Sequence, residues 1–283
     1  MTKNYFISNM QLVINDKRLT SRQASVAGSF YPKDPTQLKK TLTSLLNANE
    51  DLNIDFRTPV KAIIAPHAGY IYSGPVAAKA YSLVSTCIKR KNKITIIGPS
   101  HFVPFNGIAL SSAEFFETPL GKIKVDHHAY KLINRIPEVI YLDEAHDREH
   151  SIEVHLPFIQ YLKKDVRIIP LAVGQTSYQK VAKVLEKLCE EEDNLIIISS
   201  DLSHYHTYKY AQKYDLQTAL NIENHKCSQL GPDEACGYLP IAGLLKMAKD
   251  HKYKIKRIDL CNSGDTSGSK DSVVGYGTWI FHK

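Results

Sequence analysis

The fold class of this chain is decided by the segment Ile94-Thr95-Ile96-Ile97-Gly98-Pro99-Ser100-His101. Its first half is a continuous apolar run rich in β-branched side chains, rather than an alternation of apolar and polar residues. Such a run is typical of a strand that is covered on both faces, as in a parallel sheet. The run ends in a Gly-Pro-Ser turn that is followed by a histidine, so a polar side chain is predicted where the strand stops.

Similar apolar runs recur at even spacing along the chain. They predict further strands over residues 60–65, 166–173, 195–199 and 273–281. Helical periodicity lies between several of these strands, over residues 35–46, 74–84, 156–162, 177–190 and 233–249. Strands that alternate with helices favour a parallel sheet with helices on both sides. We expect an α/β fold, a single three-layer domain with a mostly parallel central sheet flanked by helices.

Composition excludes several classes of protein. The chain has 283 residues, of which 43% are hydrophobic and 23% charged, and its apolar runs are far shorter than the roughly 20 residues that cross a membrane. The first residues lack the pattern of a signal peptide, and five cysteines without a CxxC pair favour a reduced compartment, so a cytoplasmic location is expected. The formal net charge is +7, but the densest basic cluster, residues 89–93, is interpreted as a solvated edge rather than a nucleic-acid site.

Three predicted strands are each followed by a histidine in a polar turn: His67, His101 and His204. In parallel α/β sheets, ligands bind outside the carboxyl ends of the strands. Histidine is both a metal ligand and a proton carrier near neutral pH, so three such side chains at one edge indicate a metal site, a general base, or both. The alternative is that each histidine merely completes its own turn.

A fourth cluster, Glu149-His150-Ser151-Ile152-Glu153-Val154-His155, does not have the spacing of the HExxH zinc motif. Its glutamates could cap the helix predicted to follow. Alternatively, His150, Glu153 or His155 could orient the ligands or the substrate.

Three further features leave alternatives open. The polar segment 262–269 is interpreted as a mobile surface loop, or as a lid or third ligand segment over the pocket. Cys236 opens a predicted helix, where a thiol pKa can fall, but we interpret it as a buried, inert cysteine. Ser200, Asp201 and His204 are too close in sequence to form the usual hydrolytic triad, and a GxSxG motif is missing.

Five ordered motifs of this sequence closely resemble those of the Memo family, which includes protein B of the AmmeMemoRadiSam system. They are residues 22–32 (RQASVAGSFYP), 65–70 (APHAGY), 98–101 (GPSH), 149–157 (EHSIEVHLP) and 200–205 (SDLSHY). The resemblance runs from about Arg22 to the C-terminus. It leaves residues 1–21 as an N-terminal extension and residues 22–283 as a Memo-like α/β domain.

The resemblance implies a fold similar to that of the class III extradiol dioxygenases, which use non-haem Fe(II). His67 and His101 match the two metal-ligand histidines of that pattern. His204 matches a histidine that acts as a base or lines the metal pocket, with Asp201 beside it, and we include it in the expected metal set. Phe30 and Tyr72 match aromatic walls of the pocket.

The sequence departs from the dioxygenase pattern in its C-terminal part. The glutamate that completes a two-histidine, one-carboxylate site is missing there. The matching stretch holds Asp265, Thr266 and Asp271, while Cys261, of the residue type that some Memo relatives use, lies several positions too early. The third ligand is therefore left open, with Asp265 and Thr266 as pocket candidates.

Two hypotheses of different classes follow. In the first, the pocket binds a divalent metal, with Fe(II) expected and Zn or Cu as alternatives, and His204 with Asp201 moves a proton of a small oxidisable substrate. In the second, the pocket binds a metal, a small molecule, a peptide or a protein partner without turnover. Enzyme status is left open between them, and neither nucleic acid nor a membrane is expected as a partner.

Overall fold

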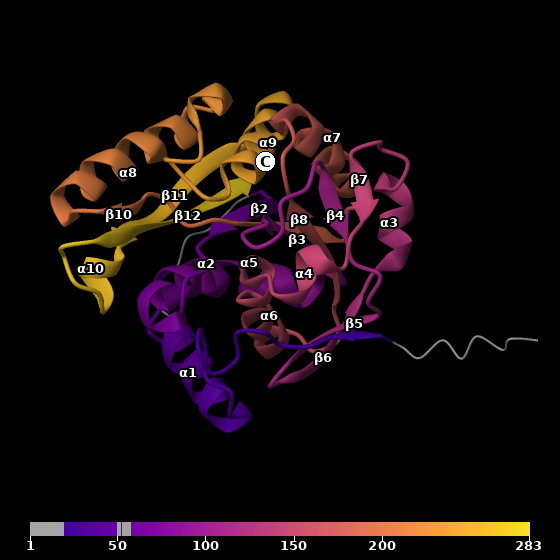
Figure 1. The fold of residues 1–283 in the computed structure, drawn as a ribbon, viewed down its shortest axis with the longest axis horizontal. Helices are drawn as coiled ribbons and strands as arrows, with labels where there is room; N and C mark the ends of the chain where they lie inside the picture. The colour runs from indigo at the N-terminus through magenta and orange to yellow at the C-terminus, as the bar shows by residue number, and fades with distance from the viewer. Residues whose placement is uncertain (1–19, 50–51, 53–57) are drawn as a thin grey trace, which may run out of the picture.

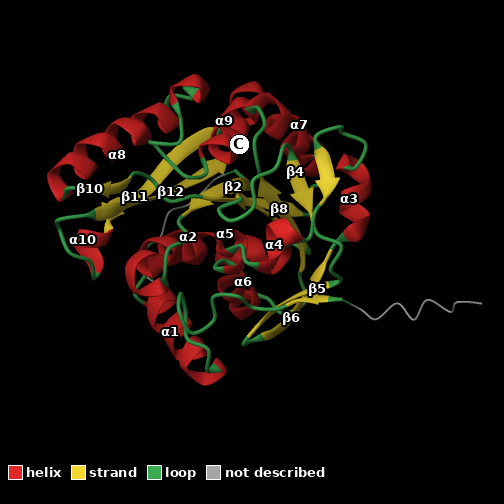
Figure 2. Ribbon diagram, viewed as in Figure 1, coloured by secondary structure: helices red, strands yellow, loops and turns green. Residues whose placement is uncertain are grey.

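The computed structural model describes residues 20–49, 52 and 58–283, and these form one large sheet covered by helices on both faces (Figures 1 and 2). The sheet has twelve strands, in the order β1-β5-β6-β8-β3-β9-β2-β12-β10, with β11 paired to β12, and β4 to β7 and β8. This arrangement confirms the predicted α/β class and the central sheet.

The centre of the sheet is parallel and consists of four of the predicted strands, β8 (Arg167–Val173), β3 (Lys93–Pro99), β9 (Asn194–Ser199) and β2 (Val60–Ala65). Their side chains are almost all buried, which explains why the sequence shows continuous apolar runs there. Because the four strands run in one direction, their carboxyl ends meet at the same edge of the sheet.

The margins make the sheet mixed. On one side, β12 (Val273–His282) pairs antiparallel with β2, and with β11 (Lys254–Asn262) and β10 (His204–His206). On the other side, β6 (Gly121–Val125) is parallel to β8 and antiparallel to β5 (Phe115–Thr118), while β1 (Ser21–Arg22) pairs with β5. The short strands β4 (Ile108–Leu110) and β7 (Val139–Tyr141) pair with each other, and β4 also pairs with β8.

The helices form the two outer layers. One layer contains α1 (Pro35–Asn47), α2 (Tyr70–Arg90), α4 (Glu144–Asp147), α5 (His150–Glu153) and α6 (Leu156–Leu162) (Figure 1). The other contains α3 (His127–Ile133), α7 (Tyr178–Cys189), α8 (Tyr208–Glu223) and α9 (Tyr238–Asp250), with the 3₁₀ turn η1 (Cys227–Gln229) before α9. Asp34 caps α1 by accepting a hydrogen bond from the Gln37 amide at 2.8 Å, as its place before Pro35 predicts.

Two expectations are corrected. The helix predicted to begin at residue 233 begins at Tyr238, because Glu234 instead closes a turn by accepting a hydrogen bond from the Gly231 amide at 2.8 Å. The segment predicted as a mobile loop opens with the short helix α10 (Ser263–Thr266), which a capping box between Asn262 and Asp265 fixes.

No helix among the described residues is long and apolar enough to cross a membrane. Most of the predicted N-terminal extension, residues 1–19, lies outside the described residues. The described chain enters the sheet at Ser21, the first residue of β1.

Candidate metal centre

Two of the predicted histidines lie side by side at the carboxyl edge of the parallel strands. His67 follows β2 and His101 follows β3, and their rings approach edge to face with centroids 5.2 Å apart. Asp201 follows β9, which lies between β2 and β3, and its Oδ1 accepts a hydrogen bond from the His67 amide at 2.8 Å. Of the three predicted strand-end histidines, His67 and His101 therefore lie together at this edge, with Asp201 beside them.

The third donor beside the two histidines is the thiol of Cys236, which precedes α9. Its Sγ lies 3.3 Å from Nε2 of His67. One ligand atom from each of His67, His101 and Cys236 falls within 4.8 Å of the other two. Donors about 2.0–2.3 Å from one tetrahedral metal lie roughly 3.5 Å from each other, so the spacing of these atoms fits a shared ion.

A buried hydrogen-bond chain fixes the ring of His67. The Ser199 hydroxyl donates to the Ser151 carbonyl at 2.5 Å, so it accepts from the two imidazoles that contact it, Nδ1 of His67 at 2.7 Å and Nε2 of His155 at 3.0 Å. Nδ1 of His155 then accepts from the Tyr81 hydroxyl at 2.9 Å. His67 therefore carries its proton on Nδ1, and the lone pair of Nε2 faces Cys236.

His101 is oriented by a carboxylate. Its Nδ1 lies 2.9 Å from Oε1 of Glu149, and its amide donates to Oε2 at 2.6 Å. Burial raises the pKa of Glu149, but hydrogen bonds and charge from His101, with a hydrogen bond from the Ser151 amide, hold that pKa at about 2. Glu149 is thus ionised, and it leaves Nε2 of His101 free to bind a metal, as carboxylates behind ligand histidines do.

His150 stacks on His101, with ring centroids 4.5 Å apart and an interplanar angle of 23°. His101, Glu149 and His150 form a second group whose ligand atoms lie within 4.8 Å of one another. Burial lowers the pKa of His150 to about 4, so its ring is neutral at pH 7. A neutral imidazole beside the centre can act as a ligand or line the space next to it.

A pocket of about 500 Å³ opens beside the centre. It is lined by the predicted residues Phe30, Tyr72, His150, Asp201 and His204, together with Tyr205, Tyr276 and serines of the segment before β12. Burial raises the pKa of Asp201 to about 7, against the hydrogen bonds that it accepts from backbone amides, and lowers the pKa of His204. The pocket thus contains a carboxyl group whose pKa lies near neutral pH and an imidazole that burial favours in its neutral form, which can accept a proton.

Comparison with known proteins identifies the family. The family described as Memo-like protein matches residues 22–280. The chain belongs to the Memo-like family. A MEMO1 family protein of Aquifex aeolicus is 36% identical over 273 residues, which cover 92% of this chain and 98% of that protein. A MEMO1 family protein of Saccharolobus islandicus is 36% identical over 278 residues, covering 90% and 97%.

A solved structure resembles the Memo-like chain in fold. The uncharacterized protein JW3007 of Escherichia coli K12 superimposes with a TM-score of 0.52 and covers 77% of this chain and 99% of its own, with 14% sequence identity. At that identity the likeness concerns the fold alone. The resemblance drawn from the five motifs is confirmed by the family match.

The Memo-like motif that contains Glu153 supports the pocket wall from behind. The carboxylate of Glu153 pairs with Arg22 and accepts hydrogen bonds from the Ser25 and Val26 amides and the Tyr31 hydroxyl. These contacts hold the segment that carries Phe30, whose ring lies 4.8 Å from that of His150. Glu153 and His155 thus act behind the site, through Phe30 and Ser199, while Glu149 both caps α5 and orients His101.

The structure places some predicted residues differently. His204 lies in β10, on the margin of the sheet, and lines the pocket without joining the group formed by His67, His101 and Cys236. Asp265 and Thr266 do not line the pocket, because Asp265 is engaged by the Asn262 amide and the Tyr208 hydroxyl, and Thr266 by the Ser263 carbonyl.

Cys236, which the sequence predicted to be a buried and inert cysteine, is half-buried, and the structure places its thiol beside His67 and His101 in a group that could hold a metal. Cys236 does not directly follow a strand, so the search for polar residues at strand ends could not find it. Its contact with His67 joins residues 169 positions apart. The one signal in the sequence was the glycine that follows Cys236. Gly237 packs so closely on the end of β9 that an added Cβ would lie 2.7 Å from the Ser199 carbonyl oxygen, and this close packing brings Cys236 to the site.

Proposed function

We propose that this Memo-like protein binds one divalent metal ion through His67, His101 and Cys236. The observation that carries the proposal is the convergence of these donors within 4.8 Å, with Nδ1 of both histidines engaged behind the site. Burial raises the pKa of the Cys236 thiol far above its usual value, so a metal must displace the thiol proton when it binds. Uptake of the metal should therefore release a proton.

The types of ligand atom limit which metal ions the site can bind. Imidazole suits Zn, Cu and Fe, and a thiolate disfavours Mg and Ca, which prefer oxygen ligands. We propose Fe(II) as the first candidate, with Zn and Cu as alternatives. Three protein ligands would leave a coordination position for a substrate or water.

Elemental analysis of protein purified without chelators tests this proposal. We expect about one metal per chain in the wild type, and loss of that metal in the His67→Ala/His101→Ala double variant and in Cys236→Ser. Cys227→Ser, which changes a half-buried thiol that belongs to neither group of possible metal ligands, is the matched control. Unchanged metal content in Cys236→Ser would refute the ligand assignment.

A second candidate function, a redox enzyme that acts on a small substrate, is supported by the adjacent pocket. The metal would supply Lewis-acid polarisation and, if it is iron, redox chemistry. Phe30 and Tyr72 would bind the apolar part of a substrate, and His204, with Asp201, would take a proton from its hydroxyl group. The alternative is that the same pocket holds a small molecule or peptide without turnover.

An aerobic assay with Fe(II) and a panel of catechols separates these alternatives. If the pocket is catalytic, wild-type protein consumes oxygen and opens the ring, while His204→Ala keeps its metal but loses general-base catalysis, about 10²–10⁴-fold in rate. Full activity in His204→Ala would remove this residue from the mechanism. Absence of turnover with bound iron would favour the non-catalytic binding role.

A further inference from the structure

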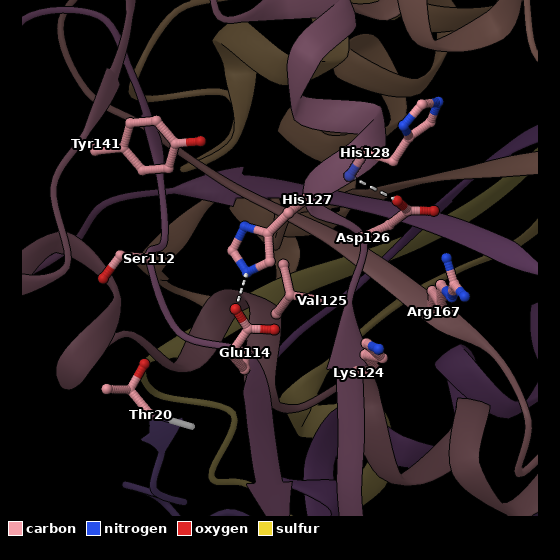
Figure 3. Close-up of a pocket in the computed structure, with 10 residues that line it drawn as sticks. All are labelled: Thr20, Ser112, Glu114, Lys124, Val125, Asp126, His127, His128, Tyr141 and Arg167. Atoms are coloured by element: carbon pink, nitrogen blue, oxygen red, sulfur yellow. Dashed lines mark hydrogen bonds and ion pairs between the residues drawn. The ribbon is translucent and has the colours of Figure 1, made fainter. Parts of the chain in front are cut away.

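A second hollow lies at the opposite end of the parallel strands from the metal centre. Lys93 begins β3 and His101 follows its end, so the two sites are separated by a strand of about 20 Å. The hollow measures about 680 Å³ and is lined by Lys124, Arg167 and eight other residues, of which His127 is one (Figure 3). A neighbouring hollow of about 590 Å³ shares Lys124 and Arg167 and adds Lys93, Lys122 and Lys164.

The two hollows are separated by a row of cations on adjacent strands. Lys93 is the register partner of Arg167 across β3 and β8, and Arg167 is the partner of Lys124 across β8 and β6. Like charges at paired positions of neighbouring strands repel each other. Lys93 pairs with Glu191 and lies 3.8 Å from Asp126, whereas no ion pair joins Lys124 or Arg167 to an acid in the described part of the chain. Lys124 and Arg167 both line the two hollows, and they therefore present to them two charges that have no ion-pair partner among the described residues.

We propose that this row binds the phosphate group of a small phosphorylated molecule. Arginine and lysine together are suited to a phosphate, because the guanidinium donates two parallel hydrogen bonds and the ammonium adds a compact charge. Tyr141 and Ser112 line the other side of the larger hollow, where they would contact the uncharged body of the ligand (Figure 3).

The acids of the larger hollow favour a compact anion over a polyanion such as RNA. Oε1 of Glu114 lies 3.7 Å from Nε2 of His127 in the middle of the lining (Figure 3). The buried Asp126 also lines this hollow, with its Oδ2 3.8 Å from Nζ of Lys93, and Asp165 lines the neighbouring one. A chain of phosphates that extended beyond the cation row would meet these carboxylates. A single phosphate or pyrophosphate group would not.

Isothermal titration calorimetry of the full chain tests the proposal with inorganic phosphate, pyrophosphate and adenosine monophosphate as probes. We expect saturable binding of one equivalent of at least one probe. The Lys124→Ala/Arg167→Ala double variant should bind it at least about tenfold more weakly, because it loses both charge-assisted contacts to the phosphate. Urea unfolding should show that this surface variant remains folded.

Two controls make the test specific. Lys209→Ala/Lys213→Ala removes the same charge from the exposed side of α8 and should bind as the wild type does. His67→Ala should also bind normally, which separates this site from the metal centre. The proposal is overturned if no probe saturates the wild type, or if Lys209→Ala/Lys213→Ala loses as much affinity as Lys124→Ala/Arg167→Ala. It is also overturned if a single-stranded RNA oligomer binds more tightly than every probe.

Discussion

The orientation of His101 depends on one buried carboxylate, Glu149. Replacing Glu149 by Gln keeps its size and an acceptor for Nδ1 of His101 but removes the charge that polarises the ring. Metal affinity should fall about 10–100-fold, as for other residues that orient a ligand. Competition with a chromophoric chelator measures the change. Glu138→Gln, which removes a surface carboxylate paired with Lys180, is the control, and equal affinities for both variants would contradict the role of Glu149.

Asp201 should make the stability of the metal-free protein depend on pH. Burial raises its folded pKa to about 7, whereas an unfolded aspartate titrates near 3.9. Between these values the folded state holds a proton that the unfolded state has lost, so stability falls as pH rises from about 4 to about 7. Above pH 7 this dependence ends.

Urea unfolding of the metal-free protein at pH 5 and pH 7 measures that dependence. From pH 5 to pH 7 the free energy of unfolding should fall by about 2 kcal/mol more in the wild type than in Asp201→Asn, because one pKa unit corresponds to 1.36 kcal/mol. Asn keeps the shape and cannot titrate, so it isolates the carboxyl group. The same loss in both proteins would show that the pKa of Asp201 is not raised.

At the scale of elements, α5 and the segment that carries Phe30 are joined through Glu153. Glu153→Gln would leave Arg22, which is also buried, without its ionic partner. Loss of one member of a buried ion pair costs about 3–5 kcal/mol, so the free energy of unfolding should fall by that amount. Proteolysis should also cut more readily near Phe30.

The matched control is the surface pair of Glu117 and Lys122, 3.2 Å apart at the β5–β6 hairpin. Glu117→Gln should change the free energy of unfolding by less than about 1 kcal/mol, as surface ion pairs do. Similar losses in the two variants would mean that Glu153 does not anchor the segment.

The elements that could be predicted from the sequence are those whose burial produces a recognisable pattern of apolar residues. The strands β2, β3, β8 and β9 were predicted to within a residue or two, because both of their faces are covered. The strands β4 and β7 escaped prediction because they are only three residues long, and β11 because its residues are largely half exposed, so none shows a long apolar run. The helix α8 shows too weak an apolar face to stand out.

The candidate site could be predicted only in part for a related reason. His67, His101 and Asp201 each follow a predicted strand, so topology brings them to one edge. Cys236 reaches that edge from the loop before α9, and only tertiary packing places it there. His204 was expected among the metal ligands. It lies in β10 and lines the pocket beside the centre, but its ring does not belong to the group formed by His67, His101 and Cys236.

For the whole molecule, a metal bound at His67, His101 and Cys236 would link three distant parts of the chain. Binding to the folded state alone should raise stability by about 2.7 kcal/mol when the free metal exceeds its dissociation constant a hundredfold. Thermal unfolding with and without added Zn²⁺ measures this effect. The increase should disappear in His67→Ala/His101→Ala, and an equal increase in that variant would indicate binding elsewhere.

The most direct test of the three-donor centre is the absorption spectrum of the protein loaded with Co²⁺. A thiolate ligand produces a near-ultraviolet charge-transfer band that histidine and carboxylate ligands do not. We predict that the wild type and His204→Ala show this band and that Cys236→Ser, loaded to the same cobalt content, does not. A band of unchanged intensity in Cys236→Ser, or its absence from the wild type, would contradict the assignment of Cys236 as the third ligand.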